Sequence, residues 1–215
     1  MPYTGDVTRG GPAATRALEH LSITKLSVGP MDNNAYLLRC GDDQVLIDAA
    51  NDAPALLEVI GAAGLSAVLT THRHGDHWQA LAAVVEATGA RSLAHTADAA
   101  EIPVVTGTLD DRDKVPVGDC ELEVIHLVGH TPGSIALLYR DPSGHGHLWT
   151  GDSLFPGGVG NTQKDETRFR SLIDDVEHKL FDRLPDDTWF YPGHGKDSTL
   201  GAERPHLAEW RERGW

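Results

Sequence analysis

The chain has 215 residues, of which 40% are hydrophobic and 23% charged, and this length suits one globular domain with a two-layer core and helices outside it. The formal net charge is −14 and the 18 Lys and Arg residues are scattered, so the surface opposes nucleic-acid phosphates and anionic membranes, and we expect neither as a partner. No apolar run approaches the ~20 residues that a membrane span requires.

The first part of the chain predicts a β-meander that leads into strand-helix units. Residues 1–20 are polar and rich in Gly, Pro and Thr, which indicates a flexible N-terminal arm before a single domain over 21–215. Alternating apolar residues between turn residues predict strands, and longer apolar segments that end at glycine predict helices. The expected elements are strands over 21–28, 35–38 and 44–47, a helix over 54–63 and a buried strand over 67–69.

The rest of the chain repeats this order of strands followed by a strand-helix unit. The expected elements are a helix over 78–88, a strand over 91–94, a helical turn over 96–101, a loop-rich segment over 104–118, strands over 122–127, 134–139 and 148–150, a long helix over 166–184, a strand over 189–191 and a final helix over 203–213. Each half can therefore build one sheet with helices on its outer face.

One loop concentrates metal-binding side chains, in the segment Thr70-Thr71-His72-Arg73-His74-Gly75-Asp76-His77. The segment joins a buried strand to a helix. Residues two apart in an extended loop point the same way, so His72 and His74 can bind one ion together. Asp76 and His77 lie at the start of the helix and can face a second ion. Imidazole and carboxylate suit zinc and similar metals, and two adjacent metals can activate one water.

This loop resembles the signature of the metallo-β-lactamase-fold hydrolases, and the resemblance extends over about residues 21–200. Three later turns match the family's motifs: Gly129-His130-Thr131-Pro132-Gly133-Ser134, Thr150-Gly151-Asp152-Ser153-Leu154-Phe155 and Pro192-Gly193-His194-Gly195. Taken alone, each of these turns is an ordinary connection between strands. The resemblance implies an α/β (α+β) fold, the αββα sandwich of the metallo-β-lactamase fold.

The resemblance also implies a complete set of ligands for two metal ions. The first ion would be held by His72, His74 and His130 and the second by Asp76, His77 and His194, with Asp152 bridging them. We expect two Zn²⁺ ions, with iron or manganese as alternatives. Asp48 follows a predicted strand and is either a turn residue or a carboxylate that orients a ligand histidine. The other seven histidines have no assigned role.

The activity implied by the resemblance is hydrolysis of a small activated acyl compound by a metal-bridging hydroxide. The candidate catalytic residues are Asp152 and Asp76, which could orient the water or pass on its proton. The short length and Gly-Asp-Ser-Leu-Phe resemble the glyoxalase II-like branch, so a thioester is the first choice of substrate. Glyoxalase II has a helical C-terminal extension that helps to bind glutathione, whereas only 21 residues follow His194. Relatives often carry Arg where Asn161 stands, so we expect weak preference for glutathione.

Other activities stay open on the same motifs. A persulfide dioxygenase would use one iron held by His72, His130 and Asp152. A lactonase or β-lactamase is a further alternative, while the charge disfavours a nuclease. Lys196 is either a contact for a substrate carboxylate or an exposed lysine. The oligomeric state is left open.

A cytoplasmic location is expected from the N-terminus and the cysteines. The first 20 residues lack the apolar core of a secretory signal peptide. The only cysteines, Cys40 and Cys120, do not form a C-x-x-C pattern, and we expect free thiols in a reducing compartment.

Overall fold

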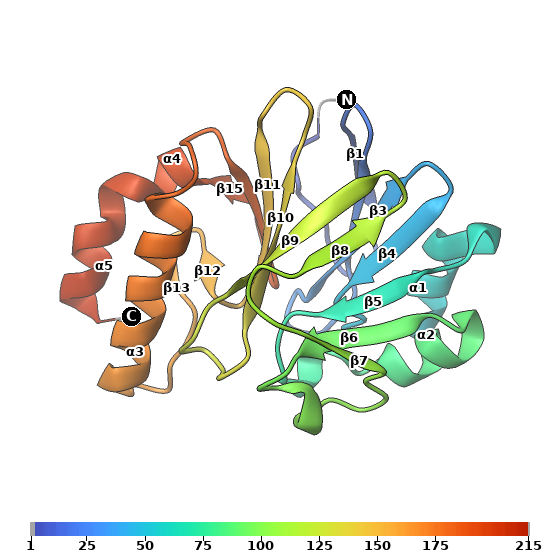
Figure 1. Cartoon of the computed structure of the whole chain (residues 1–215), viewed down its shortest axis with the longest axis horizontal. Coiled ribbons are helices and arrows are strands. Elements are labelled where there is room, and N and C mark those ends of the chain that lie inside the picture. The colour runs from blue at the N-terminus through green and yellow to red at the C-terminus, as the bar shows by residue number, and fades with distance from the viewer. Residues whose placement is uncertain (1–2, 215) are drawn as a thin grey trace.

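The computed structural model describes residues 3–214 and shows two mixed β-sheets packed face to face between two groups of helices (Figure 1). The first sheet has the order β1-β2-β3-β4-β5-β6-β7. Its strands are β1 (Ala14–Ala17), β2 (Ser22–Ser27), β3 (Asn34–Cys40), β4 (Asp43–Ile47), β5 (Ala67–Thr70), β6 (Arg91–His95) and β7 (Gly107–Leu109). The strands from β1 to β4 are antiparallel and those from β4 to β7 are parallel.

The second sheet has the order β15-β14-β11-β10-β9-β8. Its strands are β8 (Lys114–Val117), β9 (Cys120–His126), β10 (Ile135–Arg140), β11 (Gly146–Gly151), β14 (Trp189–Pro192) and β15 (Ser198–Thr199). Only β11 and β14 are parallel in this sheet. A small hairpin of β12 (Leu154–Phe155) and β13 (Gly158–Val159) follows β11.

The helices cover the outer faces of both sheets (Figure 1). Helices α1 (Ala53–Ile60) and α2 (Leu81–Thr88) pack on the first sheet, and α3 (Glu166–Val176), α4 (Leu200–Glu203) and α5 (Leu207–Arg213) pack on the second. Short 3₁₀ turns span Gly61–Ala63, Gly75–His77, Ala99–Glu101 and Arg204–His206, and a π-type turn, Glu177–Phe181, extends α3. None of the helices in residues 3–214 is long and apolar enough to span a membrane.

Alternation along the strands divides the core into three layers. In β3, Tyr36 and Leu38 point between the two sheets, whereas Ala35 and Leu37 point toward α1 and α2. In β10, Leu137 lies between the sheets, and the residues on either side of it face α3 and α5. Because successive side chains point to opposite faces, a strand with both faces covered is apolar throughout. The predicted αββα sandwich is therefore confirmed.

The prediction of a flexible arm over residues 1–20 was wrong for part of that segment. Strand β1 pairs antiparallel with β2, and the Tyr3 hydroxyl donates a hydrogen bond of 2.8 Å to Asp197. The four residues of β1 alternate between half-buried and exposed at the sheet edge, and such a short polar strand has a weak sequence signal. Residues 1 and 2 lie outside the described residues.

The segment 104–118, predicted to be loop-rich, contains β7 and β8. Both are edge strands, and β8 carries Pro116. Proline lacks the N–H that an inner strand needs, so it argues against a strand in the sequence but is tolerated at an edge. The segment thus completes both sheets.

The expectation of free thiols was also wrong, because Cys40 and Cys120 form a disulfide. Cys40 ends β3 in the first sheet and Cys120 begins β9 in the second, with their Cα atoms 6.2 Å apart. The two cysteines are 80 residues apart, and only the packing of the sheets brings them together. The cytoplasmic location drew on free thiols and remains a prediction.

Candidate metal centre

Four loops that carry the predicted ligands meet at one end of the sandwich. The segment with His72 and His77 follows β5, and His130 lies in the turn from β9 to β10. Asp152 follows β11 and His194 follows β14. Since β11 and β14 are parallel, the loops that follow these two strands leave the second sheet at the same end.

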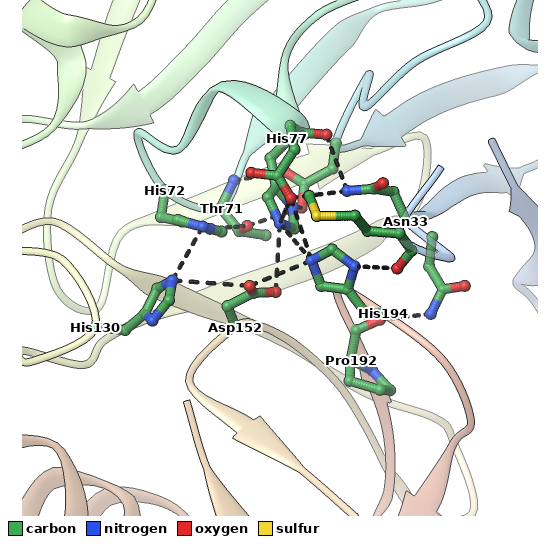
Figure 2. Close-up of polar contacts among 12 residues, drawn as sticks. Asn33, Thr71, His72, His77, His130, Asp152, Pro192 and His194 are labelled. Atoms are coloured by element: carbon green, nitrogen blue, oxygen red, sulfur yellow. Dashed lines mark hydrogen bonds and ion pairs between the residues drawn. The ribbon is translucent and has the colours of Figure 1, made fainter. Parts of the chain in front are cut away.

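The side chains predicted to hold the first ion form one compact group. The ligand atoms of His72, His74 and His130 all lie within 4.8 Å of one another. The Nε2 atoms of His72 and His130 are 3.3 Å apart (Figure 2). His72 and His74 approach the group from the same loop as expected, although the backbone between them bends at residues 72 and 73 and is not extended.

The side chains predicted to hold the second ion form another group beside it. Asp76, His77 and His194 also have ligand atoms within 4.8 Å of one another. The Nε2 atoms of His77 and His194 are 3.2 Å apart, and Asp76 Oδ2 lies 3.3 Å from Nε2 of His194. His77 follows β5 of the first sheet and His194 follows β14 of the second, and Figure 2 shows the two imidazoles close together.

The Asp152 carboxylate lies between the two groups. Its Oδ1 is 3.3 Å from Nε2 of His77, and its Oδ2 is 3.3 Å from Nε2 of His194 and 3.7 Å from Nε2 of His130 (Figure 2). Gly193 allows this approach, because a Cβ at that position would lie 2.2 Å from Asp152 Oδ1. The structure therefore brings all seven predicted residues together, and their roles as ligands remain a prediction.

In four of the histidines, the ring nitrogen that does not face the centre, Nδ1, lies beside a hydrogen-bond acceptor outside the centre. The Nδ1 atoms of His77, His130 and His194 lie 2.8 Å from Asp48 Oδ2, the Asn161 carbonyl and the Met31 carbonyl, respectively. The Nδ1 of His72 lies 3.0 Å from the Thr71 hydroxyl, which itself donates to Asp48. Acceptors at Nδ1 place the proton there and leave the Nε2 lone pairs directed into the centre.

Some of these partners were not identified from the sequence. Asp48 was given as either a turn residue or a carboxylate that orients a ligand histidine, and its position 2.8 Å from Nδ1 of His77 agrees with the second interpretation. Asn33, which donates to Asp76 Oδ2 at 2.9 Å, was missed. The acceptors at Met31 and Asn161 are backbone carbonyls, which every residue type has, so no sequence pattern could have identified these two positions. Lys196 is exposed and lies 3.5 Å from Asp6.

The protonation behaviour of the two groups differs. Burial lowers the pKa of His72 well below its ordinary value, and burial also lowers the pKa of His130 to about 4 although Asp152 opposes this. Burial acts in the same direction on His77, but the charges of Asp152 and Asp48 raise its pKa well above the ordinary value. For His194, burial is likewise outweighed by hydrogen bonds to Asp152 and Asp76, which raise the pKa to about 10.

The pKa values of the two carboxyl groups in the centre, Asp76 and Asp152, are both lowered. The hydrogen bond from His194 lowers the pKa of Asp76 to about 2. Burial alone would raise the pKa of Asp152, but His77 and His194 hold it well below its ordinary value. Burial thus favours neutral imidazoles in the first group, whereas the neighbouring carboxylates favour protonation in the second group, so a cation entering the second group must compete with a proton.

The residues fit a pair of metal ions. Asp152 Oδ1 is buried and has no hydrogen-bond partner among the described residues. Two pairs of Nε2 atoms also face each other at hydrogen-bond distance, where at most one proton can lie between them. A cation in each group would satisfy these atoms, and the set of imidazole nitrogens and carboxylate oxygens suits zinc, iron or manganese.

Comparison with known families agrees with this geometry. The sequence profile of the metallo-β-lactamase superfamily matches residues 28–194. The chain belongs to the metallo-β-lactamase superfamily. The matched segment includes all seven residues of the metal centre.

Relatives within the superfamily carry different names. Hydroxyacylglutathione hydrolase of Anaeromyxobacter dehalogenans is 42% identical over 133 residues, which cover 60% of this chain and 49% of that protein. The chain thus spans about half the length of this relative. The crystal structure of ETHE1 from Myxococcus xanthus aligns with a TM-score of 0.77 and 27% identity over 88% of this chain and 84% of that one. TTHA1623 in a di-iron-bound form aligns with a TM-score of 0.69 and 30% identity over 84% and 96% of the two chains.

Proposed function

We propose that this protein is a dinuclear metallo-hydrolase that cleaves a small acyl thioester. The observation that carries the proposal is the pair of ligand groups that share Asp152, whose two oxygens face His77 on one side and His130 and His194 on the other. A single-metal site has no need of the second group. The partial match to hydroxyacylglutathione hydrolases supports a thioester as the substrate class.

Two bound metal ions would supply a more acidic water as nucleophile and a Lewis acid for the substrate carbonyl. The protein's part is to fix the ligand atoms through the acceptors at Nδ1 and to keep Asp152 ionised between the groups. Asp76 stays a carboxylate because His194 and Asn33 donate to it, so its oxygen can orient the attacking water and accept a proton. Zinc is our first choice of metal, and the di-iron form of TTHA1623 supports iron as the alternative.

A thioester needs little help with its leaving group. Water adds to the acyl carbon, the carbon–sulfur bond breaks, and the products are a carboxylic acid and a thiol. Because a thiolate is a stable leaving group, no dedicated general acid is required. The acidic surface favours small substrates over nucleic acids.

A second candidate is a mononuclear iron persulfide dioxygenase. It is supported by the similarity to ETHE1 and by the position of His72, His130 and Asp152, which could hold a single iron. This reading leaves Asp76 and His194 without a metal to bind, so it uses less of the observed geometry.

The test combines metal analysis with an activity screen. Zinc-loaded and iron-loaded protein would be assayed on S-lactoylglutathione, simple acyl thioesters, a lactone, a β-lactam and glutathione persulfide. We expect two zinc ions per chain and thioester cleavage, with little advantage for the glutathione thioester. His74→Ala should abolish turnover, whereas His206→Ala, at an exposed histidine on the surface, should not.

Two results would overturn the proposal. One is a single iron per chain with rapid oxygen uptake on the persulfide and no thioester cleavage by the zinc form. The other is thioester cleavage by the His74→Ala variant at the rate of the unaltered protein.

A further inference from the structure

We infer that Asp98 is a positioning residue that holds the two loops of the first ligand group at the spacing a metal ion needs. Asp98 lies outside the centre, between β6 and the 3₁₀ turn Ala99–Glu101, and is 1% exposed. The inference rests on the proposed metal centre, but it does not depend on which substrate is cleaved.

The Asp98 carboxylate accepts hydrogen bonds from both loops. Its Oδ2 accepts from the backbone N–H of Arg73 at 3.0 Å and from the hydroxyl of Thr131 at 2.5 Å. Its Oδ1 accepts from the backbone N–H of Gly133 at 2.8 Å. One buried carboxylate thus connects a loop after β5 to the turn between β9 and β10, whose ligands His72 and His130 are 58 residues apart in sequence.

In the first loop, Asp98 acts on the residue between two ligands. Arg73 separates His72 from His74, and its side chain extends toward Asp98 and Glu101. The backbone bends at His72 and Arg73, and Asp98 contacts both the backbone N–H and the guanidinium of Arg73. Holding this bend keeps the two imidazoles on either side of it directed into the centre.

In the second loop, Asp98 acts just after the third ligand. Thr131 follows His130 directly, and Gly133 is close enough to Asp98 that a Cβ there would lie 2.7 Å from the Asp98 Cγ. Glycine is therefore required for this approach. The Thr131 hydroxyl also lies 2.7 Å from the Ser134 hydroxyl, which closes the turn on itself.

The contacts call for a carboxylate rather than an amide. All three groups that form hydrogen bonds with the Asp98 carboxylate are donors, and they use both of its oxygens. Asparagine of the same shape offers one oxygen and one donor nitrogen, so at least one N–H or hydroxyl would face another donor. Asp98→Asn is thus a nearly isosteric change that should disturb the spacing of the loops.

The second ligand group is held by other contacts. Asp48 accepts from His77, the Met31 carbonyl lies beside His194, and Asn33 donates to Asp76. None of these contacts includes Asp98. The effect of Asp98 should therefore be confined to the first group, which separates a positioning role from a general contribution to folding.

The experiment measures zinc affinity in two backgrounds that each keep one group complete. His194→Ala leaves the first group intact, and His74→Ala leaves the second. We expect Asp98→Asn to weaken zinc binding tenfold or more in the His194→Ala background and less than threefold in the His74→Ala background, in competition with a chromophoric chelator. The visible spectrum of the cobalt-substituted protein should change only in the first background.

Two further variants complete the design. Glu101→Gln removes the exposed ion pair with Arg73 while leaving the Asp98 contacts. In each background, this substitution should leave the zinc affinity unchanged. Thr131→Val removes the hydroxyl contacts with Asp98 and Ser134 but keeps both backbone N–H contacts to Asp98, and it serves if Asp98→Asn does not fold. Equal weakening in both backgrounds, or no weakening in the first, would overturn the inference. If the unaltered protein bound no metal at all, the proposed function itself would fail.

Discussion

The Asp48 carboxylate lies 2.8 Å from Nδ1 of His77, and both side chains are buried. The same oxygen accepts a hydrogen bond from the Thr71 hydroxyl, which lies 3.0 Å from Nδ1 of His72. One carboxylate at the end of β4 therefore orients an imidazole in each of the two ligand groups. It reaches the second group directly and the first group through a hydroxyl.

Asp48→Asn should weaken the binding of both metal ions. An amide cannot accept from His77 and from both donors of Thr71 with its single oxygen, so the proton position on His77 is no longer fixed. Loss of such a partner typically costs a factor of about 10 to 100 in metal affinity. Zinc competition with a chelator measures this, and Asp42→Asn in the exposed turn after β3 is the control. Unchanged affinity for both ions would show that Asp48 does not orient the histidines.

Asp152→Ala should lose nearly all activity, because the Asp152 carboxylate oxygens lie 3.3 to 3.7 Å from imidazoles of both ligand groups. Without the shared carboxylate, the two cations lose the charge that offsets their repulsion and fixes their spacing. If that arrangement supplies several kcal/mol of transition-state stabilisation, turnover should fall by about 10³-fold. Metal content and turnover should be measured on the same sample. Turnover near that of the unaltered protein at full metal occupancy would contradict a bridging role.

The sequence predicted which side chains converge at the candidate metal centre because the predicted ligands are clustered or lie in turns with glycine. His72, His74, Asp76 and His77 fall within six residues, so their local spacing already limits where they can point. His130, Asp152 and His194 were found through the family resemblance, since each alone looks like a turn residue. Asp98 was missed because its partners lie on two other loops and two of them are backbone N–H groups.

The same limit applies to the fold. The inner strands were found because both faces are covered and most of their residues are apolar, as in residues 67–69 of β5. The edge strands β1, β7 and β8 were missed because one side lacks a partner and their sequences are short and mixed. The disulfide was missed because no local pattern relates Cys40 to Cys120 across 80 residues.

Removing the disulfide should lower stability without changing the metal centre. A cross-link that closes a loop of this length restricts the unfolded chain, which corresponds to about 4.5 kcal/mol of stability. Cys40 lies at the carboxyl end of β3, where β4 begins, and the ligand loop follows the carboxyl end of β5, which is parallel to β4. The cross-link is therefore at the opposite end of the first sheet from the ligands.

The test is the double variant Cys40→Ser with Cys120→Ser, compared with the oxidised protein by urea unfolding and by zinc affinity. We expect a lower free energy of unfolding and an unchanged affinity for zinc. Reduced parent protein should behave like the variant. A loss of zinc affinity in the folded variant would show that the cross-link also shapes the metal centre.

Finally, His147 should make the stability of the metal-free protein depend on pH. Burial, helped by the charge of Arg16, lowers the pKa of His147 to about 4. In the unfolded chain the pKa returns to about 6.5, so between these values the unfolded state binds a proton that the folded state does not. The neutral His147 therefore contributes fully to the free energy of unfolding above about pH 6.5. This contribution is lost as the pH falls toward 4, and the free energy of unfolding decreases by roughly 1 kcal/mol per pH unit. His147→Gln should remove this slope, whereas His145→Gln, in the exposed turn before β11, should keep it. Because both variants retain the ligand histidines, the difference between their unfolding free energies across this pH range isolates His147, and equal slopes would contradict the prediction.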